Sequence, residues 1–583
     1  MPTLEWIGKS KVINHHQDVP FRVLERKYSF DENGQHNEDN GSENMIIRGD
    51  NLEALKALLP RYEGRVKCIY IDPPYNTGNE GWVYNDNVND PKIKKWLGEV
   101  VGKEGEDLTR HDKWLCMMYP RLKLLQKLLA DDGVIFISID DTEYANLKLI
   151  CDEIFGSNCF VSNISWQRTY STRNDSKGIV NEVEHLVVYS KLPDWNPNKL
   201  PRTAEMDAKY KNPDNDRTLW RTDNAFAPGA ATHQGMVYAI QHPFTGKMLY
   251  PSNGACWRYQ QDQMLEIMRG WCGYELRDLN DAHERAVVCG VPESDVRQGV
   301  QAIVLSESLE ISAQKAQAVY DRGQWPRFFF TKGGKGGIAR KTYLENVGGK
   351  LPTNFWAFTE TGHTDEAKKE MLAIFDGKAT FDTPKPHRLI EFVLKVAGNE
   401  NALILDSFAG SGTTAHAVLN MNKADGGHRK FILVEMMDYA DSITAERVKR
   451  VIRGYGEGKN AVEGTGGNFS FYDLGEPLLH GDVLNENVGV EKIREYVYFT
   501  DTKASLPESH PDEPYFMGVH IGSAYYFYYE KQAVTTLNRE FLHTVKTEAD
   551  AYVIYADLCT LSEAELEKYH ITFKKIPRDI TKL

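Results

Sequence analysis

Residues 66–75 read VKCIYIDPPY, an apolar run that ends in two prolines. The apolar part, 66–71, is typical of a buried strand in a parallel sheet. Each proline fixes its own φ and restricts the residue before it, so the strand must end in a rigid turn. Open α/β sheets bind ligands at this edge. The turn offers the Asp72 carboxylate, a backbone carbonyl and the Tyr75 ring. This set suits the exocyclic amine of a purine or pyrimidine, although D-P-P-x also occurs in ordinary loops.

A second motif lies far downstream, where residues 403–414 read LILDSFAGSGTT. It combines an apolar strand, a glycine-rich turn and hydroxyl residues suited to the start of a helix near Ala415. Gly410 and Gly412 allow a ligand to approach the backbone closely. The next strand, 430–434, ends at Glu435, near the spacing at which an acid binds ribose in dinucleotide folds. Thr413 departs from G-x-G-x-x-G, so the pattern favours a nucleoside with a non-phosphate tail, and S-adenosylmethionine fits.

Together the two motifs resemble the amino-methyltransferases of DNA, which pair a D/N/S-P-P-Y/F turn with an F-x-G-x-G turn. The catalytic turn comes first, which is the order of the β class. Further blocks match, namely RGDNL at 48–52, DKWL at 112–115 with YPRL at 119–122, DGVIFISID at 132–140 and Lys385-Pro386. The middle and C-terminal thirds are similar to the modification (Mod) subunit of type III restriction-modification systems, for example at LPTNFW 351–356, YDLGEP 472–477 and FKKIPR 573–578. The similarity covers nearly the whole chain.

The resemblance implies an α/β fold, a Rossmann-like S-adenosylmethionine-dependent methyltransferase sheet built from two sequence blocks. Strands and helices alternate over 44–190 and again over 381–455, and the region between them lacks this alternation. The expected parts are an N-terminal segment 1–43, the catalytic half 44–190, an inserted target-recognition region 191–380, the cofactor-binding half 381–455, and a small C-terminal α/β domain 456–583. Adjacent strands are expected to bring Asp72 beside Phe408.

The family chemistry implied is transfer of a methyl group from S-adenosylmethionine to the N6 amine of adenine in duplex DNA after base flipping. The implied catalytic residues are Asp72, Pro73, Pro74 and Tyr75, with Asp72 and the Pro73 carbonyl accepting the two N–H groups of the amine. The implied cofactor-binding residues are Asp50, Asp72, Lys385, Asp406, Phe408, Gly410, Gly412 and Glu435. An aspartate at the first position of the turn favours adenine over cytosine-N4. An RNA or protein-amide N-methyltransferase and a recognition subunit with vestigial chemistry remain alternatives.

The charge of the chain is acidic, with a net charge of −14 over 583 residues. This argues against a protein that simply coats DNA, because phosphate contacts need Lys and Arg. Two basic runs with interleaved aromatic residues, 166–173 and 327–341, indicate local DNA contact or solvated loops. The DNA-binding residues predicted from them are Arg168, Arg173, Arg327, Lys332, Lys335, Arg340 and Lys341.

Eight scattered cysteines with no C-x-x-C pair indicate reduced thiols and no zinc site. The histidines, His387 among them, are expected to bind no metal. No apolar run reaches membrane length and the first residues do not resemble a signal peptide, so a cytoplasmic protein is expected. The resemblance implies a homodimer. It also implies a type III restriction (helicase-nuclease) subunit as partner. This sequence shows no Walker A or nuclease motif, so DNA cleavage would need another subunit.

Overall fold

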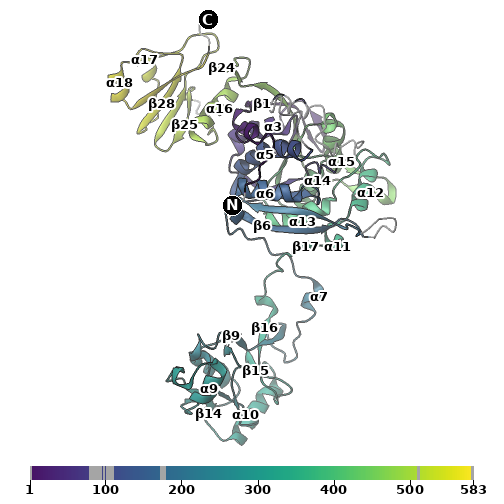
Figure 1. The fold of residues 1–583 in the computed structure, drawn as a ribbon, viewed down its shortest axis with the longest axis vertical. Coiled ribbons are helices and arrows are strands. Elements are labelled where there is room, and N and C mark those ends of the chain that lie inside the picture. Colours follow the sequence, from purple (N-terminus) through teal and green to yellow (C-terminus); the bar gives the residue numbers. More distant parts are fainter. Residues whose placement is uncertain are drawn as a thin grey trace. The chain divides into compact units, whose positions relative to one another are not determined.

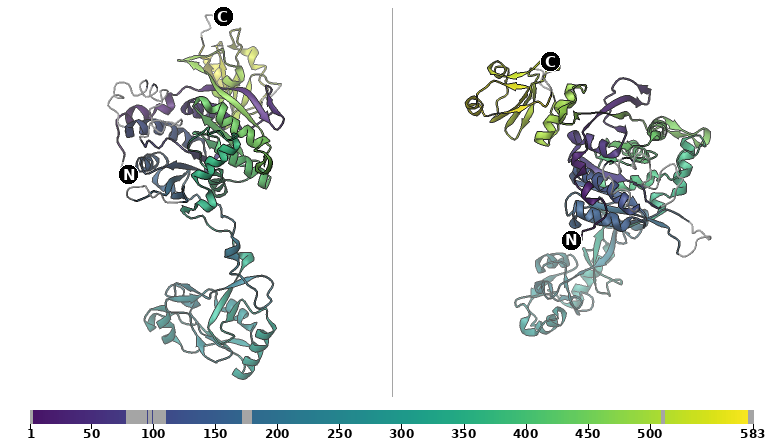
Figure 2. Two further views of the ribbon diagram at one scale, coloured as in Figure 1. Left: turned by 90° about the vertical axis from the view of Figure 1, so that its right-hand side faces the viewer. Right: turned by 45° about the horizontal axis from the view of Figure 1, so that its top comes forward.

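The computed structural model describes residues 3–77, 110–170, 179–508 and 512–578, together with Lys95 and Glu99. The chain divides into two compact units. Unit 1 comprises Met1–Asn198 and Pro352–Leu583, and unit 2 comprises Lys199–Leu351 (Figures 1 and 2). Unit 2 lies within the region 191–380 expected for target recognition. Among the described residues, no helix is both long and apolar enough to cross a bilayer.

Unit 1 is built on an eleven-stranded sheet. The strands, in spatial order, are β17 Phe355–Trp356, β6 Phe160–Gln167, β7 Val183–Ser190, β5 Leu129–Ile139, β4 Val66–Ile71, β18 Leu403–Asp406, β19 Lys430–Glu435, β3 Met45–Arg48, β22 Phe469–Pro477, β1 Arg22–Asp31 and β2 Gly34–His36. The central strands from β5 to β22 pair in parallel, whereas β6–β7, β5–β7, β1–β22 and β1–β2 pair antiparallel. This is the α/β sheet expected from the sequence.

Strand β4 pairs in parallel with β18, in the register Cys68↔Ile404 and Ile69↔Leu405. This confirms the predicted pairing between two segments that lie far apart in the sequence. All four of these side chains are fully buried, because the sheet is covered on both faces. The motif turns that follow β4 and β18 therefore emerge side by side at the carboxyl edge of the sheet.

The helices of the sheet layer explain why its strands read as continuous apolar runs. Ile69 and Ile71 pack in one core with α3, α5 and α6, while α13 contacts β4 and β5, and α14 contacts β19. The helices around the sheet are α1 Lys9–Val12, α2 His15–Asp18, α3 Asn51–Tyr62, α5 Arg110–Leu128, α6 Tyr144–Phe155, α11 Phe358–Thr361, α12 Thr364–Ile374, α13 His387–Ala397, α14 Thr413–Asp425 and α15 Glu446–Arg453.

The two ends of unit 1 differ from the expected domain boundaries. The N-terminal segment 1–43 carries β1, which pairs with β22 along most of its length, and β22 lies inside the segment 456–583 that was expected to form a separate domain. The pairing places Tyr28, Phe30, Phe469 and Phe471 in buried contact. Two segments from opposite ends of the chain therefore complete the large sheet, and the C-terminal domain begins after Pro477.

The C-terminal domain is a small α/β unit, as expected. Its sheet has the order β25 Phe516–His520, β26 Ser523–Phe527, β28 Ala551–Ala556 and β30 Ile571–Lys575, with helices α16 Val490–Thr502, α17 Arg539–Leu542 and α18 Glu563–Lys568. Ser562 and Glu565 form the predicted capping box at the start of α18.

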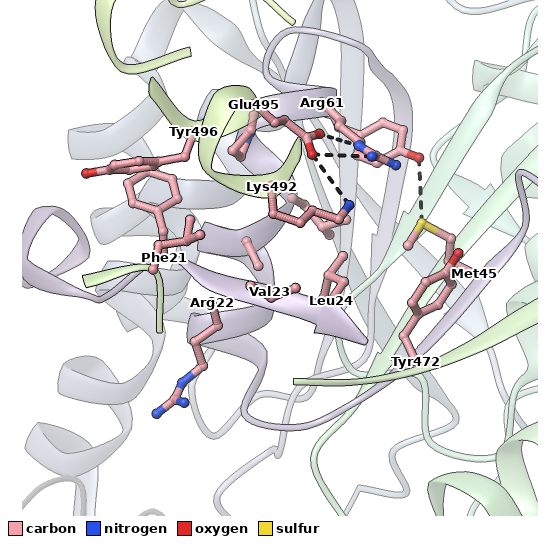
Figure 3. A pocket seen from close by; sticks show the side chains of 15 residues that line it. Phe21, Arg22, Val23, Leu24, Met45, Arg61, Tyr472, Lys492, Glu495 and Tyr496 are labelled. Carbon is pink, nitrogen blue, oxygen red and sulfur yellow. Dashed lines mark hydrogen bonds and ion pairs between the residues drawn. The ribbon is translucent and has the colours of Figure 1, made fainter. Parts of the chain in front are cut away.

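Helix α16 packs against α3 of the main sheet layer. Arg61 pairs with Glu495 across this seam, and the rings of Phe21 and Tyr496 lie 4.9 Å apart (Figure 3). The cavity between them measures about 50 Å³, which is room for water and not for a cofactor. The seam is therefore a structural contact.

Unit 2 packs helices and short strands around an aromatic core. Its elements include β8 Trp220–Asn224, β10 Ile240–Gln241, β11 Met248–Leu249, β13 Tyr274–Arg277, β14 Ala302–Leu305, β15 Phe328–Phe330, β16 Ile338–Tyr343, α8 Gln261–Arg269, α9 Ala282–Cys289 and α10 Leu309–Arg322. Trp257, Trp271 and Phe328 are almost completely buried in this core. The unit therefore has a hydrophobic core of its own.

Candidate active site

The turn that follows β4 is held in place by helix α5. Pro73 and Pro74 are buried, and Trp114 of α5, which is fully buried, donates its indole N–H to the carbonyl of Pro74 over 2.7 Å. The backbone of the turn is thereby fixed by both its own prolines and a tryptophan from the helix layer. Asp72 and Tyr75 project from a frame that cannot easily shift.

The two oxygens of Asp72 are in different situations. Oδ2 accepts a hydrogen bond from Nζ of Lys385 over 2.7 Å, whereas Oδ1 is buried and has no hydrogen-bond partner among the described residues. A buried acceptor without a donor costs about 1–3 kcal/mol, so it marks a place where a ligand donor belongs. Lys385, expected from the sequence at the cofactor site, therefore also contacts the carboxylate of Asp72 directly.

Tyr75 is anchored through its hydroxyl as well as its ring. The hydroxyl donates to Oε2 of Glu184 over 3.0 Å, and Nζ of Lys385 lies 5.0 Å from the ring centroid. Glu184, on β7, is a site residue that the sequence interpretation missed. The signal was weak, because Glu184 stands at the start of an ordinary apolar strand and reaches the site only through the antiparallel pairing of β7 with β5.

The pKa values of Asp72, Glu184 and Lys385 depend on one another, because the two carboxylates are buried beside the same ammonium. Burial raises the pKa of Asp72, and Lys385 offsets only part of that rise. Burial alone would raise the pKa of Glu184 too, but Lys385 and Arg168 outweigh it and hold that pKa below its usual value. Lys385 lies 3.7 Å from Glu184, and the two carboxylates raise its pKa despite burial, so it remains an ammonium.

The glycine-rich turn after β18 is stabilised by hydrogen bonds to Asp406, the last residue of that strand. Asp406 accepts from the backbone N–H of Phe408 over 3.0 Å and from the Thr414 hydroxyl over 2.6 Å, and burial raises the pKa of Asp406 to about 7. Gly412 has φ +81°, and a Cβ there would stand 2.9 Å from the carbonyl of Thr444. Only glycine therefore fits this position.

Glu435 closes the same turn from the next strand. Its carboxylate accepts the backbone N–H of Gly410 over 2.8 Å and that of Met437 over 2.9 Å. These two bonds fix both oxygens of the Glu435 carboxylate against the backbone of the turn. The Tyr439 hydroxyl, four residues later, and the Ser407 hydroxyl are buried and lack hydrogen-bond partners within the described part of the chain.

Asp50 caps the helix next to this turn. It accepts from the backbone N–H groups of Leu52 and Glu53, and Arg121 lies 3.3 Å from its other oxygen. The neighbouring Asn51 donates to the carbonyl of Ser407 over 3.2 Å, which ties the start of α3 to the β18 turn. The predicted cofactor residues thus come together at one edge of the sheet.

A buried charged cluster lies behind the glycine-rich turn. Arg447 donates to the hydroxyls of Ser411 and Thr413, over 3.0 Å and 2.8 Å, and pairs with Glu370. Within the described ranges, Glu370, His387 and His416 are the group whose ligand atoms come close enough to hold a metal ion. The Arg447 guanidinium already lies 3.0 Å from Glu370 and 3.1 Å from Nδ1 of His416 and supplies the positive charge there. No spacing in the sequence indicated this cluster.

The predicted DNA-contact residues fall into two groups. Arg327, just before β15, and Lys332 and Lys335, on the turn between β15 and β16, are exposed, and the described residues offer them no ion pair. Lys341 is fully buried and pairs with Asp214 and Asp216, so the prediction that it contacts DNA is wrong.

Two further basic residues are already paired. Arg340 pairs with Asp223 and is mostly buried, and Arg168 pairs with Glu184 over 2.8 Å while remaining part-exposed. Arg173 lies outside the described residues.

Comparison with known proteins agrees with this geometry. A family model described as "DNA methylase" (N6_N4_Mtase) matches residues 66–446, from β4 to the start of α15. The chain belongs to the N6/N4 DNA methylase family. The matched range begins at β4, the strand that leads into Asp72, and contains the glycine-rich turn as well as unit 2.

Two curated relatives illustrate the range of this methylase family. The Mod subunit of the type III restriction-modification enzyme StyLTI of Salmonella typhimurium is 33% identical over 71% of this chain and 58% of its own length. The type II methyltransferase M.KpnI of Klebsiella pneumoniae is 30% identical over 68% of this chain and 81% of its own. The chain spans about three fifths of the length of the first Mod subunits it matches. Among solved structures, the PvuII cytosine-N4-specific DNA methyltransferase aligns with 13% identity, a TM-score of 0.31 and coverage of 70% of this chain and 86% of its own.

Proposed function

We propose that this methylase transfers a methyl group from S-adenosylmethionine to the N6 amine of adenine in duplex DNA. The observation that carries the proposal is the open acceptor at Oδ1 of Asp72, beside the Tyr75 ring and at the same sheet edge as the glycine-rich turn. An amine can donate one of its N–H groups to this acceptor, and the planar base that carries the amine can stack on the Tyr75 ring. The family match supports a DNA base as the carrier of that amine.

The Asp72 carboxylate acts through orientation and charge. Adenine N6 is a weak nucleophile, because its lone pair is delocalised into the ring. Oδ1 of Asp72 accepts one N–H and the Pro73 carbonyl the other, which favours a pyramidal nitrogen with its lone pair directed at the methyl donor. The base must leave the duplex to reach this position, and the Tyr75 ring stacks on it. No histidine base is required.

The cofactor proposal rests on the residues around the β18 turn. The buried hydroxyls of Ser407 and Tyr439 have no hydrogen-bond partner among the described residues, so a polar ligand fits this place. The Glu435 carboxylate beside them is assigned to the ribose diol. When bound, S-adenosylmethionine supplies an activated methyl group on a sulfonium centre. The residues that would hold it are Asp50, Lys385, Asp406, Phe408, Gly410, Gly412 and Glu435, with Phe408 packing along it and Asp50 near its adenine.

DNA contact is assigned to unit 2, which we propose as the target-recognition region. The turn between β15 and β16 presents Lys332 and Lys335 on a rigid frame. Its backbone bonds join Thr331, Gly336 and Gly337, and a Cβ on Gly334 would strike Phe244. Two exposed lysines on such a turn suit phosphate contact.

Relatives that are Mod subunits of type III restriction-modification enzymes support a role of this chain as such a modification subunit. On this view it works as a homodimer, with a helicase-nuclease restriction subunit as partner. Light scattering of the purified protein tests the dimer, and a monomer with full activity at micromolar concentration contradicts it.

The experiment that tests the activity uses tritiated cofactor with duplex DNA, RNA and protein as acceptors, followed by nucleoside analysis of the labelled product. N6-methyladenine in duplex DNA is expected. N4-methylcytosine, or label in RNA or protein, overturns the proposal in favour of the corresponding alternative. Asp72→Ala should transfer no methyl group and still bind the cofactor by calorimetry. Asp141→Ala, at an exposed acid, serves as control.

A further inference from the structure

We propose that Glu184 is a positioning residue of this active site. It holds the Tyr75 hydroxyl and shares the Lys385 ammonium, so that Oδ1 of Asp72 stays open to the target amine. The inference rests on the proposed function and assigns a role to a residue outside both sequence motifs.

The geometry joins three separate elements. Glu184, 6% exposed, comes from β7, Tyr75 from the turn after β4, and Lys385 from the segment before α13. Oε2 of Glu184 accepts the Tyr75 hydroxyl over 3.0 Å and lies 3.7 Å from Nζ of Lys385, while Oε1 accepts from Arg168 over 2.8 Å. Both oxygens of Glu184 are therefore occupied by donors that would otherwise need another acceptor.

Asp72 is a second acceptor close to this hydroxyl. Burial raises the pKa of Tyr75, and the charges of Asp72 and then Glu184 raise it further, so both carboxylates are close neighbours of this hydroxyl. A buried hydroxyl without an acceptor costs about 1–3 kcal/mol, which exceeds the cost of a small rotation about a side-chain torsion. The hydroxyl already lies within hydrogen-bonding reach of Asp72. Without Glu184 it is expected to bond Asp72 alone and to compete there with the amine.

Glu184 also sets the charge balance at Asp72. The groups facing Asp72 are Lys385, Glu184, Tyr75, Tyr70 and Asp406, with Arg168 beyond Glu184. Lys385 favours the ionised form of Asp72, and the negative charge of Glu184 disfavours it. Asp72 must be ionised to accept the N–H, so activity falls as the pH drops through the pKa of Asp72.

The sign of each substitution follows. Glu184→Gln removes a negative neighbour, lowers the pKa of Asp72 and moves the acidic limb of the kcat–pH profile to lower pH. Lys385→Met removes the positive neighbour and moves the limb to higher pH. A close charge shifts a pKa by roughly one unit or more. Opposite movements are a result that general loss of structure does not produce.

The test measures single-turnover methylation of duplex DNA across pH for full-length wild type, Glu184→Gln, Lys385→Met and Glu182→Gln. Glu182 is the matched control, since it lies two residues away and outside these contacts. Glu184→Gln should lower the rate at the pH optimum about tenfold, equivalent to about 1.4 kcal/mol, with the cofactor Kd within twofold of wild type. Glu182→Gln should behave as wild type.

A double-mutant cycle with Tyr75→Phe separates positioning from folding. If Glu184 acts through the Tyr75 hydroxyl, Glu184→Gln should cost less in the Tyr75→Phe background than in wild type. An active wild type whose acidic limb is unmoved by Glu184→Gln, or moves in the same direction for both variants, overturns the inference alone. A wild type that methylates no duplex overturns the proposed function and the inference with it.

Discussion

Replacing Lys341 by methionine should destabilise unit 2 strongly, although Lys341 belongs to the basic run that the sequence assigned to DNA contact. Its ammonium is fully buried between Asp214 and Asp216, donates to the carbonyl of Trp325 over 2.7 Å and lies 5.0 Å from the Trp220 ring centroid. Methionine fills much of the volume but leaves two carboxylates without their cation.

The magnitude follows from what remains after the substitution. Asp214 keeps the indole N–H of Trp220 and the backbone N–H of Trp325, each at 2.8 Å, so its charge is partly stabilised. Breaking a buried ion pair by removing one partner costs about 3–5 kcal/mol. Domains are stable by about 5–15 kcal/mol, so the loss removes a large share of the stability of unit 2.

Urea denaturation followed by tryptophan fluorescence measures this effect, because Trp220 and Trp325 report on the site itself. Lys335→Met, in the same run but exposed, is the matched control and should change stability by less than about 0.5 kcal/mol. Lys335→Met should instead weaken DNA binding. A Lys341→Met protein that unfolds at the wild-type urea concentration, or that loses DNA affinity without losing stability, refutes the reasoning.

Three further predictions concern the sites. Glu435→Ala should weaken cofactor binding by about 1.5–3 kcal/mol, measured by calorimetry, because a charged acceptor is lost; an unchanged Kd contradicts its assignment to the ribose. Neutralising the exposed Arg327, Lys332 and Lys335 together should reduce the magnitude of the slope of log K for DNA binding against log[salt] by about two to three. An unchanged slope would show that these side chains contact only solvent. Tyr75→Phe should slow single-turnover methylation by about 0.5–1.5 kcal/mol, since its hydroxyl bonds Glu184, and Tyr75→Ala should slow it further; equal rates for wild type and Tyr75→Phe show that only the ring matters.

The central part of the fold could be predicted from the sequence because two motifs each announce a strand and the turn after it. Once both turns were assigned to one ligand site, β4 and β18 had to be neighbours, and they are. The edge of the sheet could not be predicted in this way. Strand β1 carries no motif, and the YDLGEP block within β22 does not indicate a partner strand. Their pairing depends on matching two aromatic faces from opposite ends of the chain.

Individual side chains were harder to place than strands. Lys335 and Lys341 look alike in a basic run, but Lys341 lies on β16 and faces a buried acid from elsewhere in unit 2, whereas Lys335 stands on a turn. Glu184 was missed for the same reason, since its contacts with Tyr75 and Lys385 exist only after three distant segments meet. The sequence shows that a residue is charged but not whether its side chain faces solvent or the protein interior, because tertiary packing decides that orientation.

The two ends of unit 2 pair with each other, as Leu200 and Lys350 exchange both backbone hydrogen bonds at 2.8 Å. About 150 residues therefore leave and rejoin the methyltransferase sheet at one point. If unit 2 folds first, it shortens the effective loop between β4 and β18 from roughly 330 to roughly 180 residues, which changes the closure free energy by only about 0.5 kcal/mol. The length of this insertion is thus nearly neutral for the sheet. A gene encoding this protein could exchange this segment for one of different length that recognises another DNA sequence. The pairing of β4 with β18, and with it the positions of Asp72 and Gly410, would stay the same.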